Sequence, residues 1–259
     1  MLKTYSSIVA TQNMDKKTSK MGGLFFKTSL KDTSYLSEEI IRNILAYTDS
    51  GPESESYSEA RKRTANAILK AMKLKTPSLF FRALKDCALL HRVLPSLDRC
   101  YDLDGGFYHA ETVFEHCMLV GDALPPALPL LRLAGYLHDT GKYDAAKIED
   151  GNLYFKGHEN HFEKTENDLR ELRLPEEHTA YIVAVMKVHM HPLTDKSSPK
   201  SVSRLLSRLS GLKLTYKDFM RMRIADRKGN LSKKAYTLSE IKIRLKKIYN
   251  EINTGASES

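Results

Sequence analysis

The chain has 259 residues, a formal net charge of +9 and a pI near 9.3. This length can bury one sizeable hydrophobic core, so we expect one main domain with flanking helices. No segment approaches the roughly 20 apolar residues of a membrane span, and no long apolar stretch follows the N-terminal lysine, so we expect a cytoplasmic protein without a membrane partner. The positive charge fits nucleic acid or another anionic partner, and it equally fits a charge that only keeps the protein soluble.

Three cysteines, Cys87, Cys100 and Cys117, form no Cys-x-x-Cys pair. An odd number of cysteines in a chain of this length is typical of reduced thiols in a cytosol. We therefore expect them to be core residues and not ligands or disulfide partners.

The first hundred residues divide into a polar arm and a helical region. Residues 1–34 are polar and rich in lysine, which predicts an arm or a cap. Residues 35–100 show helical patterns. We expect a helix that starts at Ser37, a loop over 49–56, a helix over 58–74 and a buried segment over 78–90.

Residues 101–232 contain most of the helical periodicity. Helices are predicted over 112–124, 130–138, 158–172, 175–189, 201–209 and 216–228. Asp150-Gly-Asn152 predicts a turn between two short extended pieces, and Thr140-Gly141 predicts a helix C-cap. Residues 233–259 predict a C-terminal helix over 239–252 and a disordered tail from Gly255. Almost every periodic segment has a helical period, so the predicted fold class is all-α.

The pair His138-Asp139 stands where an apolar helix is expected to end, and it puts a nitrogen ligand beside a charged oxygen ligand. Four residues elsewhere complete a possible ligand set: His116, His158, His189 and Asp226. Imidazole and carboxylate groups together bind divalent ions such as Mn, Fe, Ni, Co or Zn, and a carboxylate can bridge two ions. The pattern therefore indicates a metal-activated water and hydrolysis.

Asp139 has two interpretations. It can be an acid exposed at the end of a helix, but a negative charge at a helix C-terminus opposes the helix dipole. A carboxylate buried behind an apolar helix costs free energy unless it is paired or bound to metal. We therefore interpret Asp139 as a ligand.

Five segments around these residues resemble the HD-domain phosphohydrolases. They are Phe114-Glu-His-Cys-Met-Leu-Val120, Leu133 to Lys142, Gly157-His-Glu159, Val188-His-Met-His-Pro192 and Ile224-Ala-Asp-Arg-Lys-Gly229. Within that family, the chain is most similar to the HD region attached to bacterial CCA-adding tRNA nucleotidyltransferases. Residues 77–90 and Val93-Leu-Pro95 resemble the neck of that enzyme. The resemblance covers residues 35–232, with 35–100 as the neck and 101–232 as the HD domain.

The nucleotidyltransferase head of those enzymes is not recognisable. Asp102-Leu-Asp104 has the Asp-x-Asp spacing of that head but lacks the glycine-rich loop that accompanies it. CCA addition is therefore not expected.

The resemblance implies an HD-domain helical bundle with flanking helices and a divalent metal, which can be Ni, Mn, Co, Fe or Mg, as one or two ions. It implies four ligands for one ion: His116, His138, Asp139 and Asp226. In two-metal members, histidines at the places of His158 and His189 bind the second ion. In a one-metal site these two would contact substrate phosphate or transfer a proton. His161 would share a helical face with His158, so either of them can point inward.

The resemblance also implies 2',3'-cyclic phosphodiesterase, 2'-nucleotidase and phosphatase activity on nucleotides or on RNA and tRNA 3'-ends. The expected catalytic residues are Asp139, His158, His189 and Lys142. The expected substrate contacts are Lys142, Arg223 and Arg227. Lys142 can instead cap a helix, and the two arginines can instead form an exposed helix face.

Four neighbours of the ligands have predicted supporting roles. His109 and Glu111 resemble a histidine and a glutamate of the CCA-type pattern, although the spacing to His116 is one residue short. Glu115 and Glu159 adjoin ligands and are expected to orient them.

Two other functions stay open. One is a hydrolase of signalling nucleotides or cyclic oligonucleotides, which would use the same ligands. The other is a non-catalytic tRNA- or RNA-binding module whose affinity depends on salt. The residues indicate no particular oligomeric state.

Overall fold

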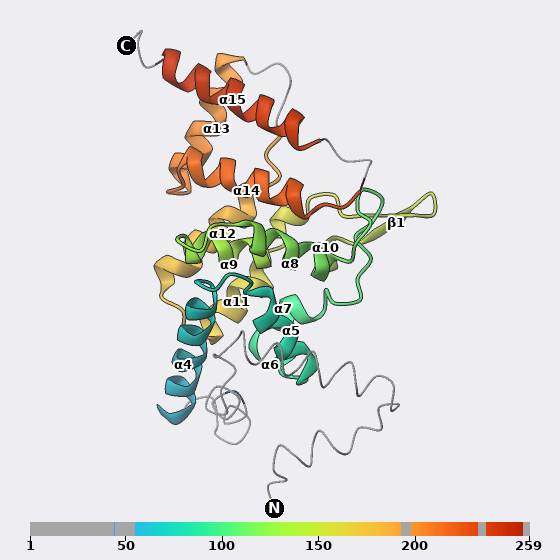
Figure 1. Cartoon of the computed structure of the whole chain (residues 1–259), viewed down its shortest axis with the longest axis vertical. Coiled ribbons are helices and arrows are strands. Elements are labelled where there is room, and N and C mark those ends of the chain that lie inside the picture. The colour runs from blue at the N-terminus through green and yellow to red at the C-terminus, as the bar shows by residue number, and fades with distance from the viewer. Residues whose placement is uncertain (1–43, 45–54, 193–197, 233–236, 256–259) are drawn as a thin grey trace, which may run out of the picture.

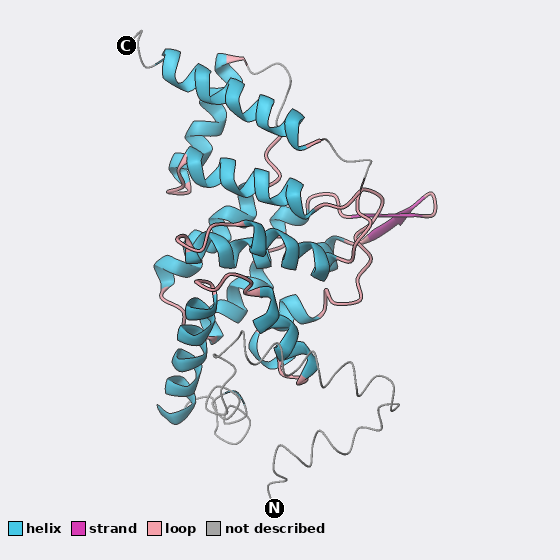
Figure 2. Ribbon diagram, viewed as in Figure 1, coloured by secondary structure: helices cyan, strands magenta, loops and turns pink. Residues whose placement is uncertain are grey.

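The computed structural model describes residue 44 and residues 55–192, 198–232 and 237–255. The predicted arm over 1–34, the helix from Ser37 and the tail after Gly255 lie outside these residues. Within the described ranges the chain is helical apart from loops and one two-stranded hairpin, which confirms the all-α prediction (Figure 2). None of the described helices is long and apolar enough to cross a membrane.

Residues 55–98 form one long helix and three short ones. They are α4 (Glu55–Ala71), α5 (Ser78–Asp86), α6 (Leu90–Val93) and α7 (Pro95–Asp98). The buried faces of these helices join a hydrophobic core that continues through the rest of the described chain. These helices are therefore packed against the rest of the described chain and share its core.

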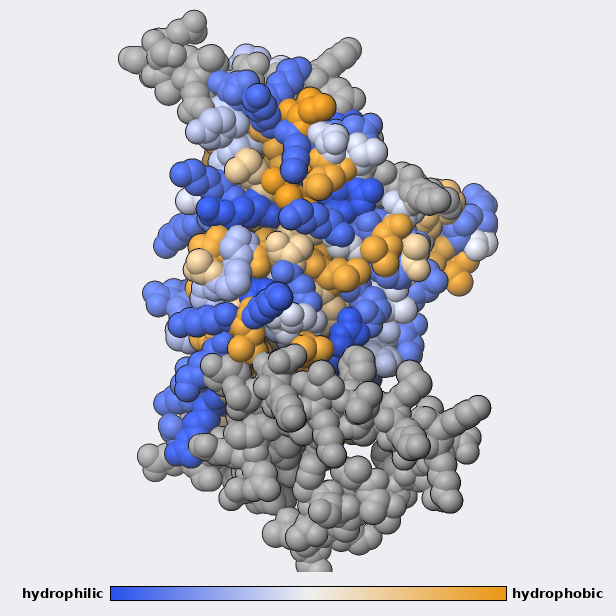
Figure 3. Space-filling model, in the orientation of Figure 1, coloured by the Kyte–Doolittle hydropathy of each residue, from blue (hydrophilic) through white to orange (hydrophobic). Residues whose placement is uncertain are grey.

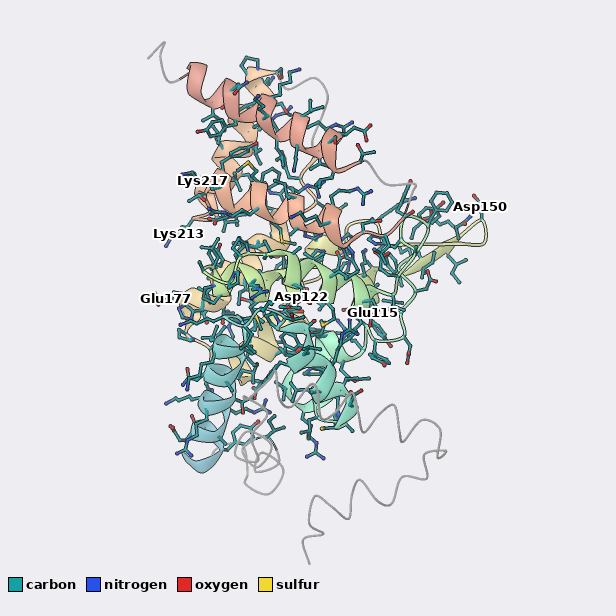
Figure 4. All side chains as sticks on the ribbon, viewed as in Figure 1. Glu115, Asp122, Asp150, Glu177, Lys213 and Lys217 are labelled. Atoms are coloured by element: carbon teal, nitrogen blue, oxygen red, sulfur yellow. The ribbon has the colours of Figure 1, made fainter. Side chains whose placement is uncertain are left out.

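The central region carries five helices, a 3-10 turn and the hairpin. The elements are α8 (Val113–Ala123), α9 (Pro129–Leu137), α10 (Lys142–Ala145), β1 (Lys147–Glu149), β2 (Asn152–Tyr154), η1 (His158–Asn160), α11 (Glu163–Glu171) and α12 (Glu176–Val188). The strands are antiparallel, with Ile148 opposite Leu153, and Asp150 lies at the projecting tip of the predicted turn (Figure 4). The helix predicted from residue 158 starts only at Glu163, because the chain first makes the η1 turn.

The C-terminal region adds α13 (Pro199–Gly211), α14 (Tyr216–Gly229) and α15 (Leu238–Gly255). In Figure 1, α8, α9 and α12 cross the middle of the molecule, and α14 lies between them and α15. α8 packs on both α9 and α14, so it is the central helix of the fold.

A glycine sets how closely α14 approaches α8. A Cβ atom on Gly229 would lie 2.5 Å from Val120 Cγ2 and 3.0 Å from the Val120 backbone nitrogen. Any larger residue would push the two helices apart. This close approach brings the side chains of His116 on α8 and Asp226 on α14 within reach of each other.

Four residues form a buried polar cluster that involves α8 and α9, and we call it the arginine cluster: Ser78, Asp122, Arg132 and Tyr136. The guanidinium of Arg132 donates to five backbone carbonyls, those of Gly121, Asp122, Met72, Leu74 and Lys75. Gly121 and Asp122 lie in the last turn of α8, and Met72, Leu74 and Lys75 lie in the loop that follows α4. The Asp122 carboxylate accepts hydrogen bonds from the Ser78 amide, the Ser78 hydroxyl and the Tyr136 hydroxyl. Every polar group of the Arg132 side chain is therefore paired.

Candidate metal centre

Short local signals position the first histidines. The Thr112 hydroxyl accepts a hydrogen bond from the Glu115 amide, so α8 begins at Val113 and places His116 in its first turns. His138 ends α9, and Asp139 follows it directly. All three candidate ligands are buried, with 0% exposure for His116, 1% for His138 and 2% for Asp139.

Four ligand atoms from α8, α14 and the end of α9 meet at one point. His116 Nε2 lies 3.1 Å from Asp226 Oδ1 and 3.5 Å from Asp139 Oδ2. His138 Nε2 lies 3.4 Å from Asp139 Oδ2 and 3.9 Å from Asp226 Oδ1. Tetrahedral ligands about 2.1 Å from an ion are separated by about 3.4 Å. The spacing therefore fits one divalent ion.

The other oxygen of Asp139 faces a second group. Asp139 Oδ1 lies 2.9 Å from His158 Nε2 and 3.4 Å from His189 Nε2, and these two nitrogens are 3.1 Å apart. The carboxylate thus stands between two sets of imidazoles, one on each oxygen. We call all six side chains the histidine–aspartate cluster: His116, His138, Asp139, His158, His189 and Asp226. The structure brings every predicted ligand into it.

Backbone carbonyls orient three of the imidazoles. His138 Nδ1 lies 2.8 Å from the Gly135 carbonyl, His158 Nδ1 2.9 Å from that of Phe155, and His189 Nδ1 2.6 Å from that of Met186. A neutral imidazole that donates from Nδ1 has its lone pair on Nε2, which is the arrangement of metal-binding histidines. His138 Nε2 is buried and has no hydrogen-bond partner, a cost that an ion would remove. The residues therefore fit a divalent metal.

The charges of the cluster also suit a cation. Burial alone would raise the pKa of Asp139, but His138, Lys142 and His158 outweigh it and hold that pKa well below its usual range. The pKa of Asp226 is likewise low, because His116 and Arg223 outweigh the effect of burial. Burial lowers the pKa of His189 to about 4. The carboxylates are thus ionised, and His189 is neutral at pH 7, as a ligand must be.

His116 is the exception in this group. Burial favours its neutral form, but the carboxylates of Asp226 and Glu111 outweigh burial and raise the pKa of His116 to about 9. Glu111 Oε1 lies 3.2 Å from His116 Nδ1 and 2.7 Å from His109 Nδ1. Glu111 therefore contacts both histidines from behind the cluster, even though the spacing of His109 departs from the CCA-type pattern.

The predicted basic residues surround the cluster. Lys142 is buried, and its Nζ lies 2.8 Å from Asp139 Oδ2 and 3.1 Å from His109 Nε2. Arg223 Nη1 donates to the His189 carbonyl at 2.7 Å and to Asp226 Oδ2 at 3.1 Å, so it positions a ligand. Arg227 donates to the Asn230 carbonyl at 2.6 Å.

These basic residues share a pocket with part of the cluster. An open pocket of about 910 Å³ is lined by Lys142, Arg223 and Arg227 together with Asp139, His158 and Asp226. Aromatic residues of the 105–108 loop and of β2, among them Tyr108 and Tyr154, line the same pocket. Sequence reasoning missed these aromatics, although the run Gly105-Gly106-Phe107-Tyr108 was a visible signal of large rings carried on a loop.

Two sequence interpretations need correction here. Glu115 does not orient a ligand, because its carboxylate pairs with Arg82 at 2.5 and 2.6 Å. Gly141 is not a left-handed C-cap, because its φ is −65° and it leads into α10. A Cβ atom there would lie 2.3 Å from the His158 carbonyl oxygen and 2.6 Å from that of His161. Gly141 is needed for space, since the chain that carries His158 crosses directly over it.

This crossing also decides between the two candidate histidines of that segment. His158 is buried and points at Asp139, whereas His161 is exposed.

Comparison with known families agrees with this geometry. Residues 106–218 match the family model of the HD domain. This part of the chain resembles an HD domain. An HD domain implies a metal-dependent hydrolase of the HD superfamily that binds divalent metals. Asp226 lies beyond the matched residues. No curated protein matches the chain, and the closer similarity to CCA-adding enzymes stays a prediction.

Proposed function

We propose that this protein is a metal-dependent phosphohydrolase that acts on nucleotides or RNA ends, of the 2',3'-cyclic phosphodiesterase, 2'-nucleotidase or phosphatase type. One observation carries the proposal. The two oxygens of Asp139 face two separate sets of imidazoles, at the wall of a pocket that also holds basic side chains. Nitrogen and oxygen donors together suit Mn, Fe, Co or Ni better than Mg, which prefers oxygen ligands alone.

The chain supplies orientation and charge for hydrolysis of a phosphate ester. A divalent ion bound to these residues supplies an activated water and withdraws charge from the phosphoryl oxygens. Arg223 fixes the direction of Asp226, and backbone carbonyls fix three imidazoles, so the ligands need no rearrangement to act. Lys142 presents an ammonium group at the pocket wall, where it can contact a phosphate as a point charge.

His158 is better placed than His189 to transfer a proton. Both contact Asp139 Oδ1, but His158 also lines the pocket, whereas His189 is buried behind it with 1% exposure. A proton donor must reach the leaving oxygen of the substrate. For a site with one ion, in which His158 Nε2 does not bind metal, we therefore assign proton transfer to His158 and not to His189.

A nucleotide or an RNA end fits the charge of this pocket. The basic side chains at its wall match a phosphate group, and the net charge of +9 favours anionic substrates. The similarity of residues 35–232 to the HD region of CCA-adding enzymes supports a substrate related to the 3'-end of RNA.

The test is hydrolysis by the full chain, stripped of metal and then refilled with Ni, Mn, Co or Mg. The panel holds 2',3'-cyclic nucleotides, 2'- and 3'-nucleotides, 3',5'-cyclic dinucleotides and an RNA that ends in a cyclic phosphate. We expect metal-dependent turnover of the 2',3'-cyclic nucleotides, of the 2'- and 3'-nucleotides and of the RNA that ends in a cyclic phosphate. This turnover should be lost in Asp139→Ala. Asp98→Ala is the matched control, because Asp98 pairs with Lys85 outside the pocket. Turnover of cyclic dinucleotides alone would indicate a signalling hydrolase. Salt-sensitive RNA binding that needs no metal, without turnover, would indicate a binding module.

A further inference from the structure

Aromatic rings gather beside the histidine–aspartate cluster, in the same pocket. Phe107 and Tyr108 come from the loop before α8, and Tyr154 ends β2. The Phe107 ring stacks on Tyr154 with centroids 5.9 Å apart, and it meets Tyr108 edge to face at 5.1 Å. We call these three rings the aromatic platform. Figure 3 shows apolar side chains beside charged ones where the hairpin projects from the molecule.

The platform is exposed although its rings are large. Tyr108 is 57% exposed and Phe107 37%. Exposed aromatic surface beside a polar site is a common mark of a binding surface, because it gains free energy only when a ligand covers it. The rings therefore require an explanation other than core packing.

The platform is held in place before any ligand arrives. The Phe107 amide donates to the Leu153 carbonyl at 3.2 Å, and the Asn230 side chain donates to the Tyr108 carbonyl at 3.2 Å. Gly106 allows the loop to lie this close to the hairpin. Its φ is +81°, and a Cβ atom there would lie 2.8 Å from the Leu153 oxygen. The loop is thus fixed to the hairpin on one side and to the end of α14 on the other.

A short path joins the platform to the cluster. His109 follows Tyr108 in the chain, and its Nε2 lies 3.1 Å from Lys142 Nζ. Lys142 in turn contacts Asp139 at 2.8 Å and lies over the Phe155 ring, 5.4 Å from its centroid. A phosphate at Lys142 and Asp139 would therefore have its sugar and base within the same pocket as the rings.

We propose that the aromatic platform binds the base of a nucleotide whose phosphate lies at the histidine–aspartate cluster. This inference rests on the proposed phosphohydrolase function. Stacking on tyrosine and phenylalanine accepts any base, because every base has a π face. The substrate class is therefore an unpaired terminal nucleotide with little base preference, whether free or at the end of an RNA.

Binding is the first test, because it does not depend on turnover. The probe is 2-aminopurine riboside 3'-monophosphate, whose fluorescence falls when the base stacks. The chain contains no Trp, so the protein adds little background. We expect quenching by the full chain with Mn²⁺ and an affinity about tenfold weaker in Tyr108→Leu and in Tyr154→Leu. Tyr143→Leu is the matched control, because Tyr143 is also exposed and packs against Arg99 outside the pocket.

Activity gives the second test. We expect Tyr108→Leu to lower kcat/KM about tenfold for 2',3'-cyclic AMP and to leave unchanged that for methyl riboside 2',3'-cyclic phosphate, which has no base. Equal rates on both substrates in the parent chain, or no quenching of the probe, would overturn the platform and leave the hydrolase standing. Quenching that is lost in both platform variants, without metal-dependent turnover of any substrate, would support the platform and overturn the hydrolase.

Discussion

The histidine–aspartate cluster and the arginine cluster both involve α8 and α9, and they differ in how their polar groups are satisfied. In the arginine cluster, all five N–H groups of Arg132 donate to carbonyls, and Asp122 accepts three hydrogen bonds. In the histidine–aspartate cluster, imidazole nitrogens face each other at 3.1 Å, and His138 Nε2 has no partner.

This difference separates a structural cluster from a binding cluster. A buried polar group costs free energy unless it is hydrogen-bonded, so a saturated cluster holds the helices together. A cluster whose buried nitrogen lone pairs have no partner destabilises the fold until a ligand binds to them. The two clusters should therefore respond in opposite ways to mutation and to metal.

The largest effect on stability is expected from Arg132→Met. The change leaves carbonyls in the loop after α4 and in the last turn of α8 without this donor, which should lower the free energy of unfolding by about 3–5 kcal/mol. Denaturant unfolding measures it. Arg63→Met is the control, because Arg63 forms an exposed pair with Glu59 and should change stability by less than about 1 kcal/mol. Equal losses in both variants would contradict the saturated cluster.

Asp139→Ala should act on metal affinity instead. It removes an oxygen from both ligand sets, and even residues behind a metal site change affinity about 10–100-fold, so we expect a loss above about 100-fold. Calorimetric titration with Mn²⁺ measures it. In folded Arg132→Met the affinity should stay within about threefold of the parent chain. If Asp139→Ala bound metal as the parent does, the ligand assignment would fail.

Gly229→Ala is expected to change both the stability of the fold and its metal affinity. The added Cβ atom would meet Val120 on α8, so the helices must separate, at a cost of about 1–3 kcal/mol in stability. Because this separation moves Asp226 away from His116, we expect weaker metal binding as well. Gly211→Ala is the matched control, since a Cβ atom there meets no neighbouring atom. Loss of stability without weaker metal binding would show that the α8–α14 distance does not set the site.

The smallest effect is expected from Glu111→Gln. Glutamine keeps the size of the side chain but removes the charge that faces His116 and His109, so we expect metal affinity to fall about tenfold with stability nearly unchanged. The same calorimetric titration measures it. Unchanged affinity would show that Glu111 only stabilises the loop, where it accepts from the Leu231 amide.

Much of this architecture could be predicted from local sequence signals. Thr112 and the prolines after Leu124 bound α8, and the helical period predicted α12 and α14 within a few residues. The ligand residues could be named because the segments around them resemble the HD-domain phosphohydrolases, and because the His138-Asp139 pair follows an apolar helix. Helix boundaries and helical periods are local features, so they can be recognised without knowledge of the fold.

What could not be predicted depends on contacts between distant segments. His158 and His161 are three residues apart, and only the crossing over Gly141 turns one inward and the other outward. Glu115 adjoins His116 but faces Arg82 on α5, a contact that no local pattern encodes. Arg132 lies within an apolar helix, and three of its carbonyl partners come from a segment some 60 residues earlier, which no local pattern indicates.

The hydrogen bonds of Arg132 to residues far away in the sequence bear on how the two parts of the chain evolve. Its partners Met72, Leu74 and Lys75 precede α5, and the Ser96 amide donates to Asp168 at 2.8 Å. A recombination event that joined residues 101–232 to a foreign N-terminal region would leave both side chains with unmatched buried groups. Residues 55–98 and the region that follows them are thus expected to be inherited as one piece.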